Sequence, residues 1–239
     1  MSKMTADNPN KTMAGKPLTV TVNNQKFMRK AIKTHFITTQ DSYLDIIHKY
    51  VGPIHRENDI LAVSEKVISV TQNRLVYKSH IRVGTLAKIL SKFVHVTPAG
   101  KGVGNPYKMQ VAIESAGVLR ILIGALLAAI TRPLGIKGIF YKVVGNEVWA
   151  IDGFNDLAFD YYDDKGVLTP ENPTEICNVI QNELGIKTII VDANDINVEI
   201  LGKSQGVYLS DDTIKQILQD NPAGQSNEQT PFILVREVE

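Results

Sequence analysis

Two aspartates stand where apolar runs typical of buried strands end abruptly, and they are the residues in this sequence best placed to do chemistry. Asp152 lies in AIDGFND and Asp192 lies in IIVDAND. Ligands of α/β proteins bind at such strand ends, and carboxylate oxygens suit Mg²⁺ or Mn²⁺. Asn155 and Asn194 could add neutral oxygens. The alternative is that each aspartate only forms a turn through its own backbone, and the spacing does not decide between the two.

The segment Ser64–Arg74, SEKVISVTQNR, is rich in β-branched residues and predicts a strand that continues Ile60–Val63. Lys66, Ser69 and Arg74 on it could donate to phosphate or carboxylate, since arginine suits bidentate anion recognition. An edge strand with an exposed lysine would explain the same residues without a ligand.

The polar loop Gly224–Pro231, GQSNEQTP, runs directly into the last predicted strand. Gln225 and Glu228 could reach a metal or a nucleotide, although a solvated loop without a ligand is favoured by the residues alone. The glycine-rich Gly100–Asn105 lacks the spacing of a P-loop, and the histidines show no zinc spacing.

The composition is that of an ordinary globular chain, with 239 residues, 44% hydrophobic and 21% charged, and a net charge of +1. The net charge gives no sign of a nucleic-acid partner. One cysteine, Cys177, excludes an internal disulfide and fits the cytoplasm; we expect it in the core. Met1–Lys16 is polar and predicts a tail, not a signal peptide. Gly117–Ile130 is apolar but shorter than a membrane span, so we expect a buried helix and no membrane partner.

Strands and helices alternate without a regular period, which predicts an α/β (α+β) fold with mixed sheets. We expect residues 1–30 to form a tail and a first strand, and residues 31–239 to form one domain. The pattern predicts strands and helices over the following segments. The strands are Leu18–Val22, Ile32–Thr38, Ile60–Thr71, a hairpin of Ile139–Val144 with Glu147–Ile151, Lys187–Val191, Val198–Leu201 and Phe232–Val238; the helices are Tyr43–Tyr50, Leu86–Phe93, Met109–Ile130 with a break near Gly117, Pro173–Leu184 and Asp211–Gln219.

Four segments together resemble the coenzyme F-420-0:L-glutamate (gamma-glutamyl) ligase family. SEKVISVTQNR, AIDGFND, IIVDAND and GQSNEQTPFILVR follow one another in the order of that family's motifs, and the resemblance covers about Ile32 to Arg236. The block from Leu86 to Tyr141 is similar to a bacterial branch. The family joins L-glutamate to a phosphorylated deazaflavin with GTP and a divalent metal, and it forms intertwined homodimers.

The resemblance implies roles for the candidate residues. It implies that Asp152 and Asp192 lie close together and bind Mg²⁺ or Mn²⁺, with Asn155, Asn194, Gln225 and Glu228 around the nucleotide and substrate. Lys66, Ser69 and Arg74 would then face phosphate or substrate. The catalytic residue is left unassigned.

The chain also departs from the family's motifs. Val70 replaces a family lysine, Asn73 a glycine, and Ile196 stands where the family has an arginine. Three hypotheses therefore stay open. The first is an amide ligase that activates a carboxylate as an acyl phosphate, with GTP as co-substrate and a small-molecule acid as acceptor. The others are a non-catalytic nucleotide- or metabolite-binding homologue and a metal-dependent phosphate hydrolase. We expect a cytoplasmic homodimer that buries Gly117–Ile130 in the core or at the interface.

Overall fold

The computed structural model divides the chain into two compact units. The first consists of Met1–Asn73 and Pro170–Glu239, and the second of Arg74–Thr169. The structure describes residues 12, 14–94, 102–136, 138–145, 148, 151–154, 160–194, 197–224 and 228–238. The first unit is thus built from two separate stretches of chain, and the predicted boundary at residue 30 falls inside one of its strands, Gln25–Ile32.

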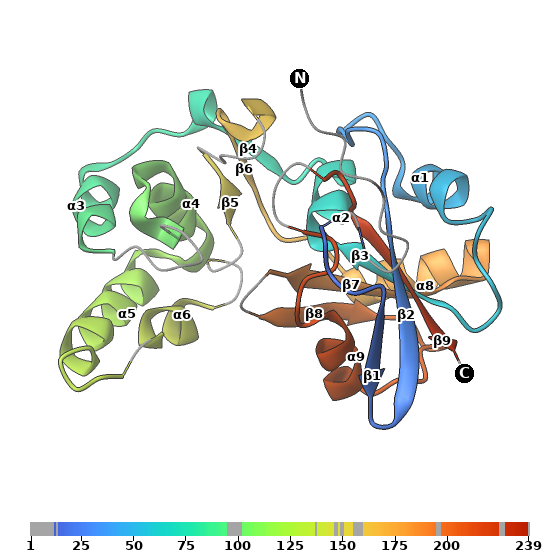
Figure 1. Ribbon diagram of the computed structural model, residues 1–239. Helices are drawn as coiled ribbons and strands as arrows, with labels where there is room; N and C mark the ends of the chain where they lie inside the picture. Colours follow the sequence, from blue (N-terminus) through green and yellow to red (C-terminus); the bar gives the residue numbers. More distant parts are fainter. Residues whose placement is uncertain are drawn as a thin grey trace, which may run out of the picture. The chain divides into compact units, whose positions relative to one another are not determined.

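A mixed six-stranded sheet forms the centre of the first unit, as the sequence predicts (Figure 1). The strand order is β1-β2-β9-β3-β7-β8, in which β3 and β7 are parallel and the other neighbours are antiparallel. The strands are β1 Thr19–Val22, β2 Gln25–Ile32, β3 Ile60–Ser64, β7 Lys187–Ala193, β8 Val198–Lys203 and β9 Phe232–Val238.

Helices cover both faces of this sheet. On one face pack α1 (Tyr43–Tyr50), α2 (Glu65–Thr71) and α8 (Pro173–Leu184), whose apolar side chains share a core with β3 and β9. On the other face packs α9 (Asp211–Leu218). The periodicity places the apolar side of each helix toward the sheet, and Cys177 on α8 is buried, as predicted.

The second unit combines helices with a small antiparallel sheet of order β4-β6-β5. A separate apolar core, to which Met109, Ile121 and Phe154 belong, holds it together. Its elements are β4 Leu75–Tyr77, α3 Thr85–Phe93, α4 Pro106–Ala116, α5 Val118–Thr131, α6 Ile139–Val144, β5 Asp152–Gly153 and β6 Lys165–Val167, with short 3₁₀ turns at Lys78–His80, Gly102–Gly104 and Asp160–Tyr162.

Gly117 separates α4 from α5, where the sequence predicts a break. Its φ of 82° is a backbone conformation that favours glycine. Within the described ranges no single helix has the length and apolarity to cross a membrane, although α4 and α5, bent by 116°, meet the criterion as a pair by length and composition.

Three predicted elements are wrong. Glu65–Thr71 is the helix α2, not a strand, and Ile139–Val144 is the helix α6, not the first arm of a hairpin. The second arm, Glu147–Ile151, lies largely outside the described residues. The strand predicted at Ile32–Thr38 is also misplaced. The strand of this region is the preceding Gln25–Ile32, which pairs with β1 and β9 and ends at Ile32.

Candidate functional site

Several polar segments of the first unit meet at one end of its sheet. Strands β2, β3 and β7 finish there, and β8 and β9 begin there. The register shows this, because Phe232 at the start of β9 lies opposite both Ile32 and Val63, and Ser64 lies beside Val191. Loops and helix starts that follow strands at this end are therefore neighbours, the arrangement in which α/β proteins bind ligands.

Asp192 lies at this end, as the second-last residue of β7, directly opposite Glu199 of β8. Side chains of directly opposed residues in an antiparallel pair lie on the same face, with their Cβ atoms about 5 Å apart. The adjoining Val191 and Ile200 pack on the α9 side. Alternation along the strands therefore directs both carboxylates to the face that α1, α2 and α8 cover.

Helix α2 begins at the same end of the sheet and on the same face. Ser64, at its N-cap position, ends β3 beside Val191, and Lys66 follows in the first turn, half-buried. Ser69 instead points into the protein with only 1% of its surface exposed. The predicted contact of Ser69 with phosphate or substrate stays a prediction.

The loop before β9 closes this end of the sheet. Ser64 donates its backbone N–H to the Pro231 carbonyl (2.9 Å), and Thr34 donates to the Gln229 carbonyl (3.0 Å). Gly224 lies so close to Glu228 that an added Cβ would come 2.7 Å from the glutamate carboxyl carbon. Gly224 itself has a φ of +83°, a backbone conformation that favours glycine.

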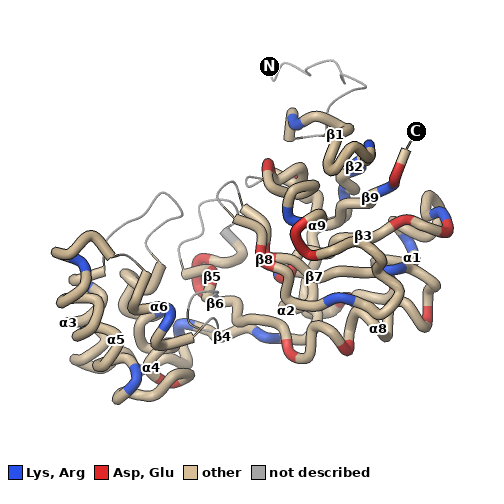
Figure 2. Tube along the Cα trace, turned by 90° about the horizontal axis from the view of Figure 1, so that it is seen from below, with Lys and Arg blue, Asp and Glu red and all other residues tan. Residues whose placement is uncertain are grey.

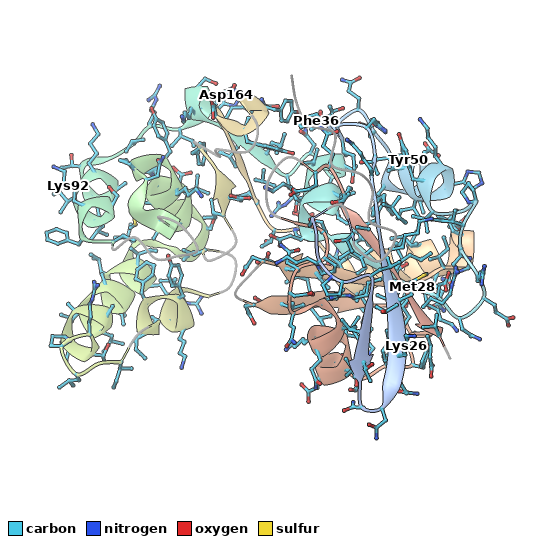
Figure 3. All side chains as sticks on the ribbon, in the orientation of Figure 1. Lys26, Met28, Phe36, Tyr50, Lys92 and Asp164 are labelled. Carbon is cyan, nitrogen blue, oxygen red and sulfur yellow. The ribbon has the colours of Figure 1, made fainter. Side chains whose placement is uncertain are left out.

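A second loop at this end is fixed by a hydrogen-bonded chain. His35 lies 2.9 Å from Asp41 through Nε2 and 2.9 Å from the Tyr50 hydroxyl through Nδ1; Figure 3 shows Tyr50 at the end of α1. Burial raises the pKa of Asp41, but hydrogen bonds from the Thr38 backbone and His35 outweigh it, so the pKa lies below its ordinary value. The Asp41 charge thus secures the segment between β2 and α1.

Asn194, the next candidate along β7, has its side chain occupied by a local turn. Its Oδ1 accepts a hydrogen bond from the Asn197 backbone N–H at 3.0 Å, and its own N–H donates to the Asn197 carbonyl at 3.0 Å. Asn194 thus forms a local turn of the kind in which a short polar side chain bonds to nearby backbone, and its predicted contact with nucleotide or substrate stays a prediction. Asn194 shapes the connection from β7 to β8 and so helps to fix the carboxylates that precede and follow it.

Asp152 lies in the second unit, in β5. Its Oδ1 accepts from the Gly153 N–H at 2.8 Å and lies 3.9 Å from Nζ of Lys108 on α4. Gly153 has a φ of +87°, and a Cβ there would meet the Lys165 carbonyl oxygen at 2.2 Å. The backbone beside this aspartate is thus tightly specified. Because Asp152 and Asp192 belong to different units, their predicted closeness stays a prediction.

Arg74 begins the second unit, and its side chain holds the two ends of that unit together. Its Nε donates to the Thr169 carbonyl at 3.1 Å, and its carbonyl accepts from the Leu168 N–H at 2.9 Å. The predicted contact of Arg74 with substrate stays a prediction. Asn155 and Gln225 lie outside the described residues.

The donor chemistry fits a hard divalent cation. Among the described residues there is no group of three or more His, Cys, Asp or Glu side chains arranged to hold a metal. Mg²⁺, however, is commonly bound by one or two carboxylates together with substrate phosphates and water. The opposed pair Asp192 and Glu199 supplies that kind of partial ligand set.

Sequence reasoning missed two charged residues beside the candidate aspartates, Glu199 and Lys108. Glu199 lies in the predicted strand Val198–Leu201, but the predicted Asp192–Asn197 turn would pair Val198 with Val191, and only the observed register places Glu199 opposite Asp192. Lys108 gave no signal either, because its closeness to Asp152 depends on how α4 packs against β5.

Comparison with known families identifies one family whose sequence model matches most of the chain. The sequence model of the family F420-0:Gamma-glutamyl ligase matches residues 31–205, which is about three quarters of the chain. The match includes β5 and β7, which carry the candidate aspartates, and also α2 and β8. A comparison with curated proteins found no match. The extent of the family match shows that the chain belongs to the F-420-0:gamma-glutamyl ligase family.

Proposed function

We propose that the protein is a nucleotide- and divalent-metal-dependent amide ligase that adds glutamate or another amino acid to an acidic acceptor. GTP as the nucleotide, Mg²⁺ or Mn²⁺ as the metal, a homodimeric state and action in the cytoplasm are parts of the same proposal. The observation that carries it is the opposed carboxylate pair Asp192 and Glu199 at a sheet end shared with α2 and the loop before β9.

The proposed reaction has two steps. A carboxylate oxygen of the acceptor attacks the terminal phosphorus of the nucleotide, which releases the nucleoside diphosphate and leaves an acyl phosphate. The amine of the amino acid then attacks the acyl carbon, forms the amide and releases inorganic phosphate and a proton. A bound divalent ion supplies charge neutralisation for the phosphates. Asp192 and Glu199 would hold it, Lys66 would contact a phosphate, and Glu228 would orient polar groups of the substrate.

A non-catalytic nucleotide-binding homologue is the second candidate, and one observation favours it. Val70 occupies the position of a family lysine and is 1% exposed, so it packs inside the first unit. This position cannot present a cation to a phosphate. A site with fewer cationic side chains should bind a triphosphate with lower affinity, because charge-assisted hydrogen bonds are about twice as strong as neutral ones.

The first test measures Mn²⁺ binding by calorimetry in the parent, Asp192→Asn and Glu199→Gln. We expect each substitution to weaken binding at least tenfold, because a hard cation requires anionic oxygen. The thermal stability should change little, because the amide keeps the shape of the carboxylate. Asp212→Asn is the matched control, since Asp212 is exposed and lies on α9, the helix that packs on the opposite face of the sheet.

Equal Mn²⁺ affinity in the parent and in both variants would remove the metal assignment. A thermal-shift series with GTP and ATP, each with and without Mg²⁺, then separates the two candidates, because ligands that bind only the folded state raise the melting temperature. Stabilisation by a nucleotide without release of phosphate in the presence of amino acids and acids would favour the binding homologue.

A further inference from the structure

Helix α5 exposes an unusual amount of apolar surface. Leu119 is 73% exposed, Leu126 is 61% exposed and Ile130 is 56% exposed. Only Ile121 and Gly124 of this helix are buried. The sequence led us to expect that this segment is buried in the core or at an interface. The chain itself does not bury it. The exposed large apolar residues of α5 and the turn after it are Val118, Leu119, Leu122, Ile123, Leu126, Leu127, Ile130, Leu134 and Ile136.

These side chains form one continuous arc on the helix. At 100° per residue, the exposed apolar positions of α5 cover about half of its circumference, centred near Leu126. Arg120 falls just beyond one edge of this arc, and Arg132, at the C-terminal end, falls beyond the other. Figure 2 shows α5 without charged positions over almost all of its length. An apolar face bordered by basic residues is the pattern of helices that lie in a lipid interface.

The charge around α5 is strongly one-sided. Residues 82–142 contain nine Lys or Arg residues and one Glu, a formal charge of +8, whereas the rest of the chain contains 17 basic and 24 acidic residues, a formal charge of −7. Lys92, for example, extends outward from α3 (Figure 3). The nearly neutral total of +1 therefore conceals an excess of basic residues in the segment that contains α5.

We propose that α5 docks this protein on an anionic lipid surface, with the apolar arc in the lipid and the basic residues on the head groups. A second copy pairing face to face through α5 would bring the two equally basic segments together, and like charges repel. Among its described residues the first unit exposes one large apolar side chain, Tyr208, and so offers no apolar counterpart. Nucleic acid would need stacking or hydrogen-bonding side chains, and the arc is aliphatic.

The proposed helix lies in the surface and does not cross the lipid. Its 14 residues extend about 21 Å, against a hydrocarbon thickness of about 30 Å. Helix α4 cannot lengthen it into a span, because Met109, Val111 and Ala112 of α4 are buried in the core of the second unit. The expectation of no membrane partner rested on the length needed for a span, and surface docking does not require that length.

The test measures co-sedimentation of the full chain with vesicles of phosphatidylcholine alone and of phosphatidylcholine with phosphatidylglycerol. We expect binding to the anionic vesicles at low salt and at least tenfold weaker binding to the neutral ones. Leu119→Asp combined with Leu126→Asp should abolish binding. Arg120→Gln should weaken it about fivefold, as expected for one basic residue at an anionic surface. Tyr208→Asp, a similarly exposed position in the first unit, is the matched control and should bind as the parent does.

Two results would overturn the proposal. One is the absence of vesicle binding by the parent at low salt. The other is a dimer, detected by sedimentation equilibrium, that Leu126→Asp converts to monomers, because a second copy would then cover the arc. Circular dichroism and melting curves of each variant establish that loss of binding is not loss of the fold.

Discussion

Two carboxylates directly opposite each other on an antiparallel ladder repel unless a cation or donors lie near them. Asp192 and Glu199 occupy such positions at the end of β7 and β8, where the neighbouring residues are apolar and pack in the core. The paired strands fix the backbone of both residues, so the two side chains start from directly opposed positions. Paired carboxylates at this end of the sheet are the feature from which we propose metal binding.

The sequence identified one member of this pair and not the other. Asp192 was visible because a carboxylate interrupts an apolar run, whereas Glu199 is one of many charged residues in a short strand. Its importance depends on the register between β7 and β8, which includes an irregularity between Ile190 and Val191. A one-residue change of register would move every side chain to the other face, so the pair could not be fixed without the structure.

The thiol of Cys177 should be unreactive in the folded protein. Burial raises its pKa to about 12, and thiolate is the reactive form. We expect no reaction with a disulfide reagent near pH 8 in buffer, and one equivalent of reaction in denaturant. Rapid reaction of the native protein would contradict the burial of α8.

The same thiol gives a pH prediction. Because the fold raises the pKa, folded protein holds this proton more tightly than the unfolded chain does. This contribution to stability is complete below the ordinary pKa of 9.0 and is lost as the pH rises toward 12. Chemical denaturation along that range should show that Cys177→Ala loses less stability than the parent.

The secondary structure was predictable where periodicity and end signals agree. Helices α3, α5 and α8 follow the predicted ranges closely, and Gly185 ends α8 in the left-handed conformation, as expected of a C-cap. Helix α2 was missed because its β-branched residues favour a strand. Burial of Val67 and Ile68 against the sheet outweighs that preference.

Helix α6 was missed because Gly145-Asn146 is also a strong turn signal. In the structure Gly145 ends the helix with a φ of +99°. Gly124 of α5 makes room for it, since a Cβ there would lie 3.1 Å from Val144 and 3.3 Å from Phe140. Gly124 thus allows α5 to pack closely against the neighbouring α6.

The contact between β8 and α8 gives a prediction about stability. A Cβ on Gly202 would lie 2.4 Å from the backbone carbonyl carbon of Pro173 at the start of α8. Gly202→Ala must therefore push strand and helix apart, and we expect a loss of about 1–3 kcal/mol in the free energy of unfolding. Urea denaturation would measure it. Gly206→Ala is the control, because its Cβ would meet the flexible end of Gln181; an equal loss in both variants would contradict the close contact.

Charge is divided between parts of the chain in a way that the total hides. The segment 82–142 carries +8 and the remainder −7, and the isoelectric point is about 7.8. Near that pH the molecule has no net charge to keep copies apart, while oppositely charged regions of different copies attract. The family's small-molecule chemistry does not by itself explain such a division.

This division predicts that added salt reduces self-association of the protein at its isoelectric point. Charges act over about 30 Å at 0.01 M salt but about 8 Å at 0.15 M, so attraction between the positive segment of one copy and the acidic remainder of another should fade. Light scattering at pH 7.8 should show self-association at the lower salt concentration and a reduction of it at the higher one. Salt does not screen apolar contacts, so association through the arc on α5 would persist or grow with salt, and Leu126→Asp would abolish it. Self-association that persists in that variant at low salt and disappears with added salt would identify charge, and not the apolar arc, as its cause.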